Sequence, residues 1–213
     1  MRKAMASLVA LVATAVTANA AIITYSTRAA FDAATVGRTN IDFNGIAPAG
    51  GFTYFGNNLV TGGVSFTTPN PNLFVIDQGF SPPIWDWNSG GVLQSNFGGD
   101  ITAALPGGKT AVGFEILGGN DSIGWSRNYI VTLSTGDVFN YLAALQPGRT
   151  FVGFATTTGF ITSVRVGDPV LGAPTIDNFV YGTLTPEPLS VVVFGGLLAA
   201  GGLAVRRRMK ATA

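Results

Sequence analysis

The residues that can carry catalytic chemistry in this chain are carboxylates, because histidine and cysteine are both absent from its 213 residues. The sequence therefore excludes Ser-His-Asp catalysis, imidazole or thiolate metal sites and cysteine nucleophiles. A carboxylate pair, as in glycoside hydrolysis, is the remaining option. Its possible members are Asp77, Asp86, Glu115 and Asp121. Their spacing brings no two of them together, so we expect a non-enzyme and keep a glycoside hydrolase as second alternative.

The segment with Trp85, Asp86 and Trp87 is the main candidate for ligand binding. It lies between the prolines 82–83 and the glycines 90–91. Two indole rings that flank a carboxylate can form a platform for stacking a sugar. In a strand, however, residues 85 and 87 point to the same face and can fill or cover the core. The sequence favours this structural role and leaves ligand binding as the alternative.

The sequence GGKT at 107–110 resembles the end of a phosphate-binding loop, but the match is incomplete. That loop requires glycine at position 103, where this chain has Ala103, and it precedes a helix. The residues 111–117 alternate like a strand instead. We therefore interpret 107–110 as a turn.

The composition of residues 21–185 argues against a nucleic-acid partner. This part of the chain has six basic and ten acidic residues, a net charge of −4, and no basic cluster. Proteins that bind nucleic acid carry basic surfaces that neutralise phosphates. We therefore expect that the protein does not bind nucleic acid.

Short apolar runs separated by Gly, Pro and Asn predict one all-β domain over residues 21–185. The expected strands are 41–43, 64–67, 73–76, 101–105, 111–117, 129–134, 138–142, 151–156, 161–166 and 176–181. One short helix is expected at 27–34, capped by Ser26 and ended before Gly37. About ten strands with little helix favour two packed antiparallel sheets, in a jelly-roll-like sandwich.

An internal repeat supports this prediction. The sequence LPGGKTAVGF at 105–114 is similar to LQPGRTFVGF at 145–154. Each copy has a Pro/Gly turn, a base, a Thr and a strand with an internal glycine, which usually marks a bulge or a close backbone approach. We predict that the two copies form equivalent strands.

The first 20 residues have the pattern of a secretory signal peptide. Arg2 and Lys3 precede an apolar run over 4–16, and the small residues Ala18 and Ala20 form a cleavage motif. The apolar run is shorter than the roughly 20 residues of a membrane span. We expect export with cleavage after Ala20.

The C-terminal segment 186–208 has three parts in order. The box Pro186-Glu187-Pro188 is followed by residues 189–205, 17 residues without charge, and then by Arg206, Arg207 and Arg208. A helix of that length is about 26 Å long, enough to cross the hydrocarbon core of a bilayer. The arginines predict that residues 209–213 form a cytoplasmic tail.

This tripartite segment resembles the PEP-CTERM sorting signal of Gram-negative bacteria, which is also termed an ice-binding protein C-terminal domain. The resemblance implies exosortase as partner, with recognition and cleavage at Pro186, Glu187 and Pro188 and orientation by Arg206, Arg207 and Arg208. It also implies an inner-membrane anchored precursor that is passed to the cell surface or extracellular matrix.

The body is similar to domains that precede such signals, through IDFNG at 41–45, TAVGF at 110–114 and IDNF at 176–179. The resemblance implies a jelly-roll fold like that of carbohydrate-binding modules. In those modules an Asp of the last strand holds a structural Ca²⁺, which implies Asp177 with Asp42 and Asn44 as ligands; the alternative is that Asp177 accepts backbone hydrogen bonds at a sandwich corner. No other cofactor is expected.

The combined expectation is an exported, non-catalytic surface or matrix protein with a structural or adhesive role, associated with exopolysaccharide. The first alternative is a lectin-like carbohydrate-binding module whose ligand stacks on Trp85 and Trp87.

Overall fold

The computed structural model describes residues 21–69, 72–80, 90–96, 98–118, 128–167 and 172–185. They form fourteen strands and one short helix. The first half contains β1 (Ile22–Tyr25), α1 (Arg28–Ala34), β2 (Thr35–Ile41), β3 (Phe52–Tyr54), β4 (Asn58–Thr61), β5 (Val64–Thr67), β6 (Leu73–Asp77) and β7 (Gly91–Ser95). The second half contains β8 (Ile101–Ala104), β9 (Ala111–Leu117), β10 (Asn128–Leu133), β11 (Val138–Leu142), β12 (Arg149–Thr156), β13 (Ser163–Gly167) and β14 (Thr175–Leu184).

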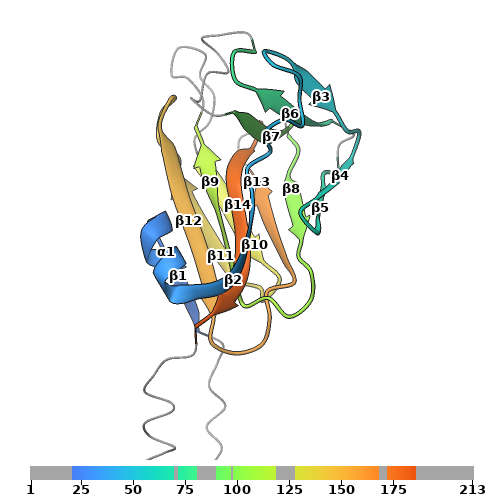
Figure 1. Ribbon diagram of the computed structural model, residues 1–213. Helices are drawn as coiled ribbons and strands as arrows, with labels where there is room; N and C mark the ends of the chain where they lie inside the picture. Colours follow the sequence, from blue (N-terminus) through green and yellow to red (C-terminus); the bar gives the residue numbers. More distant parts are fainter. Residues whose placement is uncertain are drawn as a thin grey trace, which may run out of the picture.

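The strands form two antiparallel sheets that face each other (Figure 1). The large sheet has the order β1-β12-β9-β14-β7-β6-β3, with β2 also paired to β14. The small sheet has the order β11-β10-β13-β8-β5-β4. The prediction of an all-β sandwich with two antiparallel sheets is confirmed.

The strand β14 holds the large sheet together. On one edge its residues 176–182 lie beside β9. On the other edge it pairs with β7 at its start and with β2 from Phe179 onward. The pairing with β9 shifts between Asp177 and Val180, and Asn178 has a φ of 48°. Asn tolerates this left-handed conformation better than most residues. The irregularity therefore lies at a residue type that accommodates it.

Alternating residues of both sheets fill the space between them. On β9, Val112, Phe114 and Ile116 face this core, and Phe114 stacks on Phe179 of β14 with ring centroids 5.9 Å apart. From the small sheet, Phe66 contacts Phe179 edge-on at 5.1 Å. Burial of such side chains supplies most of the stability of a sandwich. The outward-facing residues of the same strands are thereby left to form the outer surface of the large sheet.

The helix α1 covers one end of that outer surface. Phe31 is fully buried there and packs edge-on against Phe151 at 5.7 Å and Tyr25 at 5.6 Å. The helix was expected, but its cap is Thr27 and not Ser26, because the Thr27 side chain accepts a hydrogen bond from the Ala30 N–H. No helix among the residues described is long and apolar enough to span a membrane.

The two repeats form β9 and β12, which are neighbouring antiparallel strands with Gly113 directly opposite Gly153. A Cβ on Gly153 would come within 2.8 Å of the Phe31 ring and 3.0 Å of the Phe151 ring, and one on Gly113 within 2.7 Å of Phe151. The prediction of equivalent strands is confirmed. The glycines make room for the aromatic rings beneath α1.

Several strand boundaries differ from those expected. The strand expected at 41–43 ends at Ile41, because Phe43 has a φ of 56° and enters the core from a turn. Four strands were not expected: β1, β3, β4 and β7. They are short or rich in Gly and polar residues, so only their pairing with neighbouring strands identifies them.

Candidate functional site

The outer face of the large sheet carries a group of aromatic side chains at the end opposite α1. We call Phe52, Tyr54, Phe74 and Phe80 the aromatic surface. In the register of β3 and β6, Tyr54 lies opposite Phe74 and Phe52 lies opposite Ile76. Opposed residues point to the same side of a sheet. Phe52 and Tyr54 are 50% and 52% exposed, so large apolar rings are presented to solvent.

The rings of the aromatic surface contact one another. Phe52 lies edge-on to Phe80 at 5.0 Å and to Phe74 at 6.4 Å, and Tyr54 lies 6.2 Å from Phe74. Aromatic pairs at such separations stabilise each other beyond their buried area. The surface is therefore a preformed group of rings and not a set of isolated exposed residues.

Three of these rings surround a pocket of about 190 Å³. Its lining is formed by Phe52, Phe74, Ile76, Phe80, Gln94, Ser95, Asn96 and Ala173. Beneath it, Ile76 packs with Val92 and Leu117. The Gln94 side chain is fixed because its Nε2 donates to Thr175 Oγ1 at 2.8 Å. The site thus combines apolar walls with the side-chain amides of Gln94 and Asn96 on one side, as small-ligand pockets do.

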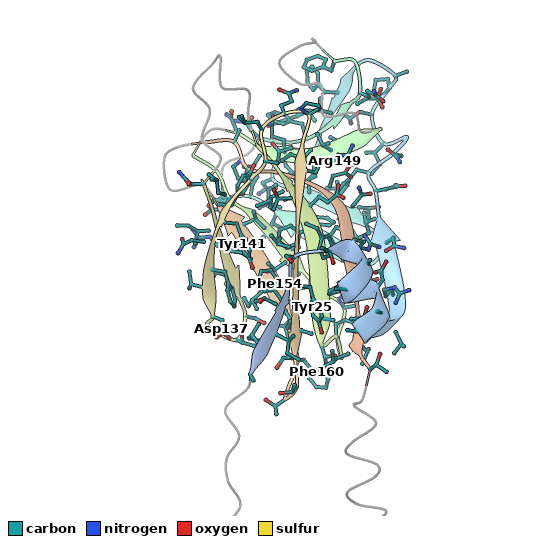
Figure 2. All side chains as sticks on the ribbon, turned by 90° about the vertical axis from the view of Figure 1, so that its left-hand side faces the viewer. Tyr25, Asp137, Tyr141, Arg149, Phe154 and Phe160 are labelled. Carbon is teal, nitrogen blue, oxygen red and sulfur yellow. The ribbon has the colours of Figure 1, made fainter. Side chains whose placement is uncertain are left out.

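A charged cluster lies on the same outer face, on strands β9, β12 and β14. Arg149 Nη1 lies 3.1 Å from Glu115 Oε2 and 3.5 Å from Asp177 Oδ2. Asn178 donates from Nδ2 to Glu115 Oε2 at 2.8 Å and from its N–H to Asp177 Oδ1 at 2.6 Å. Figure 2 shows Arg149 on its strand, above Phe154 and Tyr25. The two carboxylates share one guanidinium, the arrangement of a structural ion-pair network.

The juxtaposition of Glu115 and Asp177 was not expected from the sequence. The two residues are directly paired in the register of β9 and β14. Of the other carboxylates considered for glycoside hydrolysis, Asp77 accepts a hydrogen bond from the Gly50 N–H at 2.8 Å. Asp86 and Asp121 lie outside the described residues. Sequence spacing carries no signal for a pairing that depends on strand register.

The expected calcium ligands occupy different surroundings. Asp42 is exposed, and its Oδ1 accepts from the Asn44 N–H at 3.2 Å. Asp177 is 1% exposed and lies beside Arg149. Within the part of the chain that the structure describes, no three His, Cys, Asp or Glu side chains are grouped to hold a metal ion. Calcium binding by Asp42, Asn44 and Asp177 stays a prediction.

Two tyrosines outside the aromatic surface have perturbed ionisation. Burial raises the pKa of Tyr141, which packs against Phe154 at 6.0 Å, and it raises the pKa of Tyr25 beside Phe31. Both shifts come from desolvation of the phenolate. The two residues serve packing, and neither lines the aromatic pocket.

Several predicted sites lie outside the described residues. They are Trp85, Asp86 and Trp87, the signal peptide with Ala18 and Ala20, and the C-terminal residues Pro186, Glu187, Pro188, Arg206, Arg207 and Arg208. The segment with the two tryptophans connects β6 to β7. Sequence reasoning missed the aromatic surface itself, although the aromatic residues at 52, 54 and 55 were a visible signal.

Comparison of the chain with protein-family models gives no match, and comparison with curated proteins also gives none.

Proposed function

We propose that the protein is an exported, non-catalytic adhesive component whose sandwich, jelly-roll-like in topology, binds exopolysaccharide through the aromatic surface. The observation that carries this proposal is the exposed group of four rings, three of which line a pocket with a polar wall. Exposed apolar side chains that are grouped around a pocket mark ligand- or partner-binding sites more often than apolar residues scattered singly over a surface.

The chemistry of the aromatic surface suits a sugar. A pyranose ring has an apolar face of C–H groups and a rim of hydroxyls, so it can stack on an aromatic ring while its edge forms hydrogen bonds. Phe52 and Tyr54 provide half-exposed rings. Gln94 and Asn96 provide side-chain amides beside them. Neutral groups of this kind fit a polysaccharide better than an ionic ligand.

The cellular route in this proposal comes from the sequence. Residues 1–20 would direct export, and residues 189–205 would hold the precursor in the inner membrane. Exosortase would then act at Pro186-Glu187-Pro188 and release the sandwich to the cell surface or matrix. Both steps leave residues 21–185 outside the cytoplasm.

Polysaccharide binding is tested with matrix exopolysaccharide in affinity electrophoresis. The double variant Phe52→Ala/Tyr54→Ala should lose most of the retardation, because the stacking rings are removed from an exposed site. The matched control is Phe160→Ala, since Phe160 is 58% exposed but lies at the other end of the sandwich. Equal retardation of the double variant and the parent would refute binding through this surface.

The lectin-like alternative differs in the rings that hold the sugar. The double variant Trp85→Ala/Trp87→Ala, if folded, should bind normally when the aromatic surface is the site. If only this variant lost binding, the binding site would instead be assigned to residues 81–89.

Sorting is tested by mapping both termini of the native protein by mass spectrometry. We expect a matrix form that begins at Ala21 and ends near Pro186. An intact C-terminus found only in the membrane fraction would mean a permanently anchored protein.

A further inference from the structure

Both ends of the described sandwich lie at the same end of the molecule (Figure 1). The first strand begins beside Thr156, through the pairing of Ile22 with that residue. The last strand ends beside Thr110, whose Oγ1 accepts a hydrogen bond from the Leu184 N–H at 2.7 Å. Thr156 and Thr110 also contact each other, because the Thr156 N–H donates a hydrogen bond to the Thr110 carbonyl at 2.8 Å. We call this end of the sandwich the exit end.

The loops 105–110 and 157–162 form the surface of the exit end. They are joined by the hydrogen bond from the Ile161 N–H to the Lys109 carbonyl at 2.9 Å. Phe160 is 58% exposed, and Figure 2 shows it at the tip of this end. The residues before it, Thr157 to Gly159, are exposed and small. The exit end therefore presents one aromatic ring that no larger neighbour on its own loop shields.

Among the described residues, the charged groups nearest this end are Lys109, Asp137 and the Arg38–Asp32 pair, which lies beside the last residues of β14. Lys109 lies over the Tyr181 ring with its Nζ 5.2 Å from the centroid. Asp137 lies at the β10–β11 turn, where it accepts from Thr135 Oγ1 at 2.7 Å. The ring beside Lys109 is the buried Tyr181, so Phe160 and Lys109 are separate features of this end. Exposed aromatic rings and lysine side chains are both suited to the interface of an anionic membrane.

The length of the chain limits how far the exit end can stand from a membrane. The uncharged run begins at Leu189, four residues after Thr185. Four extended residues span at most about 14 Å. The headgroup layer on each side of the hydrocarbon core is itself about 5–8 Å thick. With the apolar run in the bilayer, the exit end has to lie at or just above the headgroups.

We infer that the exit end is a lipid-docking surface of the tail-bearing precursor. Phe160 enters the interface between headgroups and acyl chains, and Lys109 faces anionic headgroups. This inference rests on the membrane-anchored precursor of the proposed function. It fixes the orientation of the sandwich, with the aromatic surface pointing away from the membrane while the tail is intact.

The test uses the full chain, which is suited to site-specific labelling because it has no native cysteine. Thr158→Cys and Gln78→Cys each place one nitroxide label on an exposed residue, the first at the exit end and the second in the turn after β6. The protein is reconstituted in nanodiscs of phosphatidylethanolamine with a minority of phosphatidylglycerol. Collision with a water-soluble nickel reagent should fall at least about twofold at position 158 relative to position 78.

A second substitution separates docking from simple proximity to the disc. Adding Phe160→Ser to the Thr158→Cys chain should restore most of the nickel accessibility at position 158. Adding Phe52→Ser, a matched loss of an exposed ring, should change nothing there. Equal accessibility at 158 with and without Phe160 would overturn the inference.

A third label distinguishes the two proposals. Leu197→Cys lies within the apolar run. If position 197 is shielded while position 158 is as accessible as position 78, the anchor stands and lipid docking is wrong. If position 197 is itself accessible to nickel, the membrane anchor of the proposed function fails and the docking surface fails with it.

Discussion

The two ends of the large sheet's outer face differ in what covers them. At one end, α1 places Phe31 over Gly153 and Phe151, and the ring is completely buried. At the other end, Phe52 and Tyr54 remain about half exposed, and Phe52 lines a pocket. Aromatic residues are used at both ends, so composition alone does not separate packing from recognition. The difference is that α1 covers the rings at one end, whereas the rings at the other end remain exposed to solvent.

The charged cluster lies on strands that connect these two regions. Arg149 precedes Phe151 on β12, and Glu115 precedes Leu117 on β9, each by two residues. Residues two apart in a strand face the same side. One row of outward-facing side chains therefore passes from the covered aromatic region through an ion pair to the apolar floor near the open pocket. Substitutions along this row can tell the regions apart.

The largest effect is expected at the covered end. Phe31→Ala removes a fully buried ring that anchors α1, and the free energy of unfolding should fall by about 3–5 kcal/mol. Urea denaturation followed by circular dichroism measures the change. Val36→Ala, at a half-exposed residue of β2, is the control and should be close to neutral. A loss under about 1 kcal/mol for Phe31→Ala would mean that the helix contributes little to the fold.

The second largest loss of stability is expected when the guanidinium of Arg149 is removed. Arg149→Met removes a guanidinium from beside Asp177, whose side chain is almost fully buried at 1% exposure. Breaking a fully buried pair costs about 3–5 kcal/mol, and partial exposure of Arg149 lowers the expected loss to about 2 kcal/mol. The double variant Arg149→Met/Asp177→Asn should recover part of that stability in the same denaturation experiment. Additive losses would show that the two groups are not coupled.

A smaller loss is expected from filling the space under the rings. Gly153→Ala places a Cβ within 2.8 Å of Phe31 and 3.0 Å of Phe151, so both rings have to shift. Overpacking of this kind costs about 1–3 kcal/mol. Adding Phe31→Ala should make Gly153→Ala much less harmful, which a double-mutant cycle of thermal midpoints would measure. Equal losses in both backgrounds would place the strain elsewhere.

The smallest effect on stability is expected at the open end. Phe52→Ala should lower the free energy of unfolding by about 1 kcal/mol, because half of the ring is already in water and its contacts with Phe74 and Phe80 are what is lost. The same variant should nevertheless weaken polysaccharide retardation. Differential scanning calorimetry and affinity electrophoresis on one preparation compare the two readouts. If Phe52→Ala caused a large loss of stability but left retardation unchanged, the ring of Phe52 would serve packing and not polysaccharide recognition.

The parts of the fold that were predictable rest on local patterns. The strands at Ala111–Leu117 and Val138–Leu142 match their expected bounds because apolar residues and turn signals mark both ends. The helix was visible around Phe31, but its cap depended on whether Thr27 or Ser26 turned its hydroxyl to the Ala30 N–H. Ser and Thr are both good N-cap residues, so residue type alone does not decide between two adjacent hydroxyls.

The parts that were missed depend on contacts between distant segments. Strand β3 has three residues in a glycine-rich stretch, and only its pairing with β6 makes Phe52 and Tyr54 neighbours of Phe74. The pairing of Asp177 with Glu115 likewise follows from register. A one-residue shift would send either side chain into the core. Sequence spacing gives no access to such relations.

The place of β14 has a consequence for when the sandwich can form. This strand is among the last described residues of the chain, yet it pairs with β2, β7 and β9 in the middle of the large sheet. A chain that is threaded outward from its N-terminus cannot complete this sheet until residues 175–184 have emerged. On the proposed route, the sandwich would close only as the sorting signal arrived at the membrane. Completion of the fold would then require that residues 21–184 have crossed the membrane, while the sorting signal is still held in it.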